Sequence, residues 1–184
     1  MPELPEVETI VRDLRRVIVG KTLVRISVLD NRLKKPGVRL PQKIFAVRRH
    51  GKYIILELVG GEKLILHLRM TGGLLFKKQI ARFADSSRRA RFAKATARRA
   101  NSKSQIIEDA HERVRFCFKD GSTLYFLDAR RFGTLGWQRS GDVLPPLGTD
   151  PFSRRFTSKN VVEFFSKTCR AIKSALLDQK IISG

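Results

Sequence analysis

Apolar residues at the start of the chain recur three and four positions apart, the spacing that places side chains on one face of a helix. They are Val7, Ile10, Val11, Leu14, Val17 and Ile18. Pro5 suits the first turn, where its missing N–H would be unpaired in any case, and Gly20 is a common helix end. We predict a helix between Pro5 and Gly20, preceded by a short extended lead.

From Lys21 to Trp137 the hydrophobic pattern changes to a period of two. Short runs rich in Ile, Val, Leu and Phe fall at 22–29, 43–48, 53–58, 63–68, 114–118 and 123–127. Gly60-Gly61 and Asp120-Gly121 each lie between two such runs, which is typical of β-hairpins. About eight strands at this spacing favour a β-sandwich or barrel.

The chain changes again after Trp137. A loop with three prolines at 141–151 precedes an apolar run at 161–165 that predicts a helix, with Thr157 or Ser158 as its cap. A second helix is predicted over 171–177. We therefore expect an α+β fold: an N-terminal helix, an eight-stranded antiparallel β-sandwich and a helical tail. The predicted division is a sandwich domain at 1–139, a linker at 140–156 and a helical segment at 157–184.

The net charge of the chain narrows its possible functions more than the apolar pattern does. The chain has 38 Lys and Arg against 17 Asp and Glu, a net charge of +21, and a field of that strength attracts phosphate or anionic lipid. No stretch approaches the roughly 18 apolar residues of a membrane span, and the start of the chain is not a signal peptide. Two cysteines and three scattered histidines favour neither a disulfide framework nor a zinc site. We expect an intracellular protein with a polyanionic partner.

A basic insert at 77–105 interrupts the strands. It holds ten Lys or Arg and one acid, Asp85. It is either a solvated insert between strands or an arm that lies along phosphates when nucleic acid binds, and the two hypotheses are compatible.

The first residues suggest a specific chemistry. Removal of Met1 would leave Pro2 as a secondary amine, and N-terminal amines have a pKa of about 7.7–8.0 in model compounds. A neutral amine can attack a sugar C1′ and form a Schiff-base intermediate, with the carboxylate of Glu3 beside it to move protons. The alternative is an ordinary helix lead-in with a proline and acidic capping residues.

Five motifs occur in order along the chain: PELPEVET at 2–9, GKYIILEL at 51–58, HLRMTG at 67–72, DARRFG at 128–133 and LLDQ at 176–179. Together they resemble the formamidopyrimidine-DNA glycosylase / endonuclease VIII family of base-excision repair enzymes, most closely its bacterial formamidopyrimidine branch. The resemblance implies the same N-terminal sandwich domain, with DNA held between it and a helical domain. It also implies Pro2 as the Schiff-base nucleophile, Glu3 as proton donor and acceptor, and Lys52 as a second proton donor. Judged without the resemblance, Lys52 is equally an ordinary lysine at a strand edge.

The resemblance further implies that Met70, Arg130 and Phe132 fill the gap left when a damaged base is flipped out of the duplex. The planar fork of Arg130 suits hydrogen bonds to the orphaned cytosine. Arg131 would contact a phosphate, and His111 would contact DNA. Judged without the resemblance, residues such as Met70 and Phe132 are more often core residues at strand spacing.

The sequence departs from the family pattern in three places. Arg113 stands where a second histidine is usual, and the basic insert is longer than expected. After LLDQ, the asparagine that clamps phosphates and the four-cysteine zinc finger are absent from these 184 residues. We therefore expect an incomplete helix–two-turn–helix segment, no metal and no cofactor.

Two functions remain open at this stage. The first is a bifunctional glycosylase and abasic-site lyase that removes oxidised purines from double-stranded DNA, weakened by truncation because phosphate contacts supply much of DNA affinity. The second is a non-catalytic DNA-binding remnant or gene fragment of the same family. In either case we expect a monomer without a membrane partner, in the cytoplasm or nucleoid of a bacterium.

Overall fold

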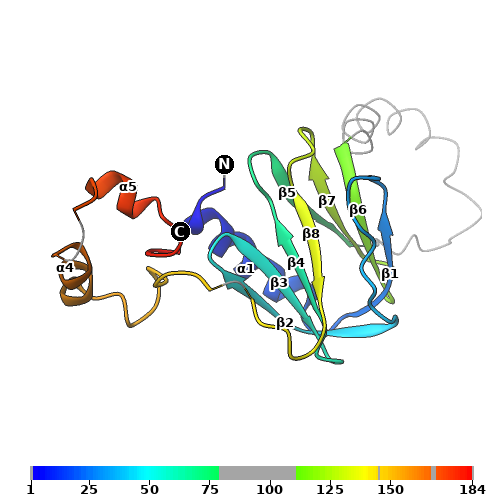
Figure 1. Ribbon diagram of the computed structural model, residues 1–184. Helices are drawn as coiled ribbons and strands as arrows, with labels where there is room; N and C mark the ends of the chain where they lie inside the picture. Colours follow the sequence, from blue (N-terminus) through cyan, green and yellow to red (C-terminus); the bar gives the residue numbers. More distant parts are fainter. Residues whose placement is uncertain (1, 79–110, 145, 167–168, 184) are drawn as a thin grey trace, which may run out of the picture.

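The computed structural model describes residues 2–78, 111–144, 146–166 and 169–183 (Figure 1). The long helix is α1, Leu4–Ile18, and the two short C-terminal helices are α4, Ser158–Ser166, and α5, Ile172–Leu176. The strands are β1 Thr22–Val28, β2 Gln42–His50, β3 Tyr53–Leu58, β4 Lys63–His67, β5 Gly72–Lys77, β6 Glu112–Phe118, β7 Thr123–Asp128 and β8 Thr134–Gln138. Residues 79–105 of the predicted basic insert lie outside the described residues.

The strands form one antiparallel order, β5-β7-β6-β1-β2-β3-β4-β8. β1 and β2 pair over two residues only, and the sheet folds over there into two layers of four strands (Figure 1). Both layers share one core, since Phe116 and Phe126 belong to the same buried cluster as Leu56 and Leu66. The α+β fold class and the eight antiparallel strands predicted from the sequence are confirmed.

Helix α1 contributes one face to this core. It packs against β2 and β3, and Val7, Val11 and Ile18 are almost fully buried, as the helical spacing predicts. At its start, the amide of Glu3 donates to a carboxylate oxygen of Glu6 at 2.9 Å. The helix therefore begins directly after the two residues predicted to carry the chemistry.

The C-terminal segment is held together by backbone pairing. The amide of Gly148 donates to the carbonyl of Gln179 at 2.8 Å, and the amide of Thr149 donates to that of Ile181 at 3.0 Å. At α4, Asn160 donates its amide to the hydroxyl of Thr157 at 3.3 Å, as expected of the predicted cap. No helix in the described ranges is long and apolar enough to cross a membrane. The division into sandwich, linker and helical segment stays a prediction.

Candidate active site

The three predicted catalytic residues meet at the start of α1. Lys52 lies in the two-residue turn between β2 and β3, and its ammonium nitrogen is 2.5 Å from Oε2 of Glu3. The Lys52 side chain is 12% exposed, whereas that of Glu3 is 52% exposed. Pro2, directly before Glu3, is half-buried. The site thus has an acid and a base in contact beside the first residues of the chain, and the carboxylate is open to a ligand.

Two turns at the same end of the sandwich carry the predicted base-gap residues. Met70 lies in the turn between β4 and β5 (residues 68–71, the Met70 turn), and Phe132 in the turn between β7 and β8 (residues 129–133, the Phe132 turn). Met70 is 48% exposed and Phe132 54% exposed, so the alternative that they belong to the core is wrong. A guanidinium nitrogen of Arg130 is 4.0 Å from the sulfur of Met70, which places the two turns side by side.

Asp128 forms hydrogen bonds with both turns. Its buried carboxylate accepts the hydroxyl of Thr71 at 2.5 Å, the amide of Gly133 at 2.6 Å and the amide of Arg130 at 3.1 Å. Burial by itself would raise the pKa of Asp128, but these hydrogen bonds, with one from the amide of Phe132, hold the pKa below its usual value. One ionised group therefore fixes both turns.

Each turn contains one non-glycine residue with left-handed backbone. Arg69 in the Met70 turn has φ +56°, and Arg131 in the Phe132 turn has φ +62°. Such conformations cost about 1–3 kcal/mol and persist where surrounding contacts enforce them. The amide of Arg69 donates to Nδ1 of His67 at 3.0 Å. Burial, with the nearby charges of Arg69 and Lys52, lowers the pKa of His67 to about 4, so this nitrogen remains an acceptor at neutral pH.

The remaining predicted DNA contacts lie near the Phe132 turn. Arg131 is exposed on that turn, and His111 is half-buried directly before β6. Arg113, which stands where the family has a second histidine, is 3% exposed and forms an ion pair with Asp30. Burial and the charge of Arg131 lower the pKa of the Arg113 guanidinium. Arg113 therefore supports the fold from inside the sandwich.

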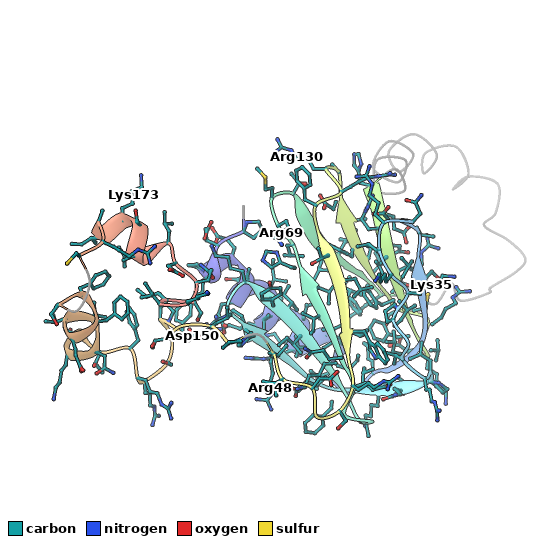
Figure 2. All side chains as sticks on the ribbon, viewed as in Figure 1. Lys35, Arg48, Arg69, Arg130, Asp150 and Lys173 are labelled. Atoms are coloured by element: carbon teal, nitrogen blue, oxygen red, sulfur yellow. The ribbon has the colours of Figure 1, made fainter. Side chains whose placement is uncertain are left out.

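The structure adds one cationic residue that the sequence did not single out, Lys173 of α5. Figure 2 shows Lys173 of α5 and Arg130 extending toward the upper edge of the view on either side of the N-terminus, with Arg69 between them. Lys173 lies within the second predicted helix, at 171–177. It gave no distinctive signal in the sequence, because basic residues are common throughout this chain. In the described residues, no group of three or more His, Cys, Asp or Glu side chains is placed to hold a metal ion.

Comparisons with known proteins identify the family of this chain. The family model of the formamidopyrimidine-DNA glycosylase N-terminal domain matches residues 1–135. Formamidopyrimidine-DNA glycosylase of Halalkalibacterium halodurans is 36% identical over 197 residues, which cover all of this chain and 62% of the relative. That of Thermus thermophilus is 32% identical over 190 residues, covering 60% of the relative. The chain therefore spans about three fifths of the length of these curated relatives.

Solved structures give the same result. Lactococcus lactis formamidopyrimidine-DNA glycosylase, non-covalently bound to DNA containing an abasic site, superposes with a TM-score of 0.74 at 28% identity. The match covers all of this chain and 65% of that one. A related structure contains DNA with a carbocyclic 8-oxoguanine and has the same TM-score. This chain belongs to the formamidopyrimidine-DNA glycosylase family.

Proposed function

We propose that the chain removes oxidised purines, such as 8-oxoguanine and formamidopyrimidines, from double-stranded DNA and then cleaves the strand at the abasic site. The observation that carries this proposal is the contact between Glu3 and Lys52 beside Pro2. The DNA-bound relatives support the choice of substrate. We further propose that the protein acts as a monomer at the bacterial nucleoid.

Pro2 supplies the nucleophile once Met1 has been removed. Its nitrogen attacks C1′ of the damaged nucleotide, the bond from C1′ to the base breaks, and opening of the bond to O4′ gives an iminium. Loss of a proton from C2′ then breaks the C3′–O bond, and water hydrolyses the iminium to free Pro2. The base and O4′ each gain a proton, while the Pro2 nitrogen and C2′ each lose one.

Glu3 and Lys52 carry these protons. The carboxylate of Glu3 accepts protons and returns them, and the ammonium of Lys52 donates to a leaving oxygen. Their 2.5 Å contact keeps both groups at one place and lets a proton pass between them. The greater exposure of Glu3 leaves room for the sugar to approach its carboxylate.

The Met70 and Phe132 turns keep the damaged base out of the stack. Met70 and Phe132 are apolar, half exposed and carried by neighbouring turns, the properties of side chains that enter a duplex between bases. Arg130, beside Met70, supplies the donors for the unpaired base opposite the lesion. The net charge of +21 draws the phosphate backbone toward this surface.

Borohydride trapping tests the proposed activity. The purified chain, with Met1 removed, is incubated with duplex DNA carrying one abasic site, and borohydride reduces any iminium to a stable adduct. We expect an adduct with this chain and with the control variant Pro5→Ala, which changes an exposed proline outside the site. We expect none with a chain that retains a residue ahead of Pro2, because the Pro2 nitrogen is then an amide and cannot attack C1′. DNA binding with no adduct from the processed chain would instead support a non-catalytic DNA-binding protein.

A further inference from the structure

Two consecutive arginines on β2 have opposite environments. Arg48 is 62% exposed and pairs with Glu57 at 2.9 Å. Arg49 is 6% exposed and lies inside the protein, beneath the turn that carries Lys52. Figure 2 shows Arg48 at the lower edge of the view, away from the N-terminus.

The buried guanidinium of Arg49 donates to three separate segments. Its Nε donates to the carboxylate of Glu8 on α1 at 2.8 Å, and one terminal nitrogen donates to the carboxylate of Asp150 at 2.7 Å. The other terminal nitrogen donates to the carbonyl of Gly51 at 3.2 Å, the peptide group that joins Gly51 to Lys52. The ring of Phe152 lies 5.4 Å from the centre of the guanidinium.

Each of these segments holds a different part of the site. Glu8 is on the helix whose first turn follows Glu3, and the Gly51 carbonyl belongs to the peptide that positions Lys52. Asp150 directly follows Thr149, which pairs with the 181–183 segment. In Figure 2, Asp150 lies where the chain leaves the sandwich toward α4 and α5. The planar guanidinium of Arg49 therefore connects α1, the Gly51–Lys52 turn and the segment that leads to α4 and α5.

The Gly51–Lys52 turn has little freedom to move independently of these contacts. Gly51 has φ +57°, and a Cβ at this position would lie 2.6 Å from a methyl group of Leu147 and 3.7 Å from Cβ of Ser183. The turn is thus packed against the same C-terminal segment that Asp150 ties to Arg49. A shift of that segment is transmitted to Lys52 through both the packing and the guanidinium.

We propose that Arg49 is a positioning residue that sets the distance between Lys52 and Glu3 by tying the Lys52 turn, α1 and the 147–152 segment to one another. This inference rests on the proposed lyase function. Only arginine presents donors in several directions from one rigid plane, so lysine can replace the charge of Arg49 but not its simultaneous contacts. Arg49 does not touch DNA in this arrangement, since its side chain is buried.

The test separates the chemical step from DNA binding. Arg49→Lys is compared with Arg48→Lys, the same substitution at the exposed neighbour. At saturating abasic-site DNA, we expect the single-turnover rate of adduct formation to fall about tenfold or more in Arg49→Lys, because small displacements of reacting groups have effects of this size. DNA affinity should change by no more than about twofold in either variant, as expected for residues without phosphate contacts. An unchanged rate in folded Arg49→Lys, or a loss explained by weaker DNA binding, would overturn the inference.

A second measurement is independent of activity. Amide hydrogen exchange should become faster in the Gly51–Lys52 turn and in the 147–152 segment of Arg49→Lys, but not in Arg48→Lys. Asp150→Asn, which removes one contact of Arg49 at a 32% exposed position, should affect the 147–152 segment more than α1. If the unmodified chain forms no adduct, the proposed function fails while hydrogen exchange still decides the role of Arg49. Equal rates of amide hydrogen exchange in the two arginine variants would reject the positioning role of Arg49.

Discussion

Asp128 is the residue on which both exposed turns depend. Asp128 is 2% exposed, and its carboxylate accepts hydrogen bonds from the Met70 turn and from the Phe132 turn. The exposed side chains of the two turns are thus held in place by a buried carboxylate.

Replacement of Asp128 by Asn should destabilise the fold. The amide replaces one of the two acceptor oxygens with an N–H donor, which then faces the amide of either Gly133 or Arg130. We therefore expect a loss of about 2–3 kcal/mol in the free energy of unfolding at pH 7. Because the folded pKa of Asp128 is lowered, its ionised form stabilises the protein above the unfolded pKa of about 3.9, and that contribution is lost as pH falls further. Urea unfolding at pH 7 and pH 3 measures this: the difference between the two proteins should shrink at pH 3. A constant difference would contradict the role of the carboxylate.

His67 should make stability depend on pH in a different range. Its pKa is lowered to about 4 in the folded protein from 6.5, so the unfolded chain binds the proton first as pH falls. The contribution is complete above pH 6.5 and is lost between pH 6.5 and 4, by about 2–3 kcal/mol over that range. His67→Asn keeps an acceptor near the Arg69 amide but cannot titrate. Urea midpoints across this range should fall less steeply in the variant, and parallel curves would contradict the assignment.

The two arginines of β2 show that the sequence does not predict which partners a single side chain will have in the folded protein. Arg48 and Arg49 are adjacent and chemically identical, and alternation predicts only that they face opposite sides of the strand. The partners of Arg49 come from α1 and from residue 150, far away in the sequence, whereas Arg48 pairs with nearby Glu57. Pro2, Glu3 and Lys52 were predicted because their motifs resemble a known family, whereas Arg49, Asp128 and His67 act through contacts that only the folded chain reveals.

At the element scale, the Met70 and Phe132 turns are shaped by glycines next to the strands. A Cβ at Gly72 would overlap the carbonyl oxygen of Leu68, and one at Gly133 would overlap the ring of Phe126. The next residue, Gly73, has nothing within 4 Å of a Cβ position. Neighbouring glycines on β5 therefore provide a matched pair.

Gly72→Ala should destabilise the protein by about 1–3 kcal/mol, the range for forced overlap in a packed region. Gly73→Ala should remain within about 0.5 kcal/mol of the original chain. Urea unfolding of both variants at neutral pH compares them directly. Equal stability of the two variants would contradict the close approach at Gly72.

The exposed side chains of Met70 and Phe132 should matter for function and not for stability. Met70→Ala and Phe132→Ala remove half-exposed side chains, so each should change the free energy of unfolding by less than about 0.5 kcal/mol. Excision of 8-oxoguanine should fall more than adduct formation at an abasic site, where no base is left to expel. Phe45→Ala, at a 63% exposed phenylalanine on β2, is the control. Equal losses on the two substrates would contradict a role in base expulsion.

Strand periodicity predicted most elements because most strands bury one face. The predicted run 53–58 agrees with β3, and that at 123–127 ends one residue before β7 does. β5 and β8 had no predicted bounds: Gly72-Gly73 and Gly136 weaken the apolar alternation, and the side chains of Leu74 and Leu75 are only partly buried. Local pattern therefore failed where the turns of the site join the sheet.

At the scale of the whole molecule, the positions of single cations relative to the N-terminus distinguish them from one another. Figure 2 places Lys173 and Arg130 on either side of the N-terminus, whereas Lys35 lies at the far right of the sandwich. A duplex bound over the site would reach the first two cations and not the third.

Lys173→Ala should therefore weaken DNA binding and reduce the slope of log K against log salt by about one, the value for one lost phosphate contact. Lys35→Ala removes the same charge and should leave that slope unchanged. Fluorescence anisotropy with a labelled duplex at several salt concentrations measures both. Equal effects of the two variants would mean that only net charge matters.

In the proposed mechanism, Pro2 bonds covalently to the sugar, with Glu3 and Lys52 beside it. Mass spectrometry of peptides from the borohydride-trapped complex tests it most directly, because the mass added by the DNA fragment marks the residue that formed the iminium. We predict that the added mass lies on Pro2, at the N-terminus of the processed chain. An adduct on Lys52 or another lysine, with Pro2 unmodified, would contradict this mechanism.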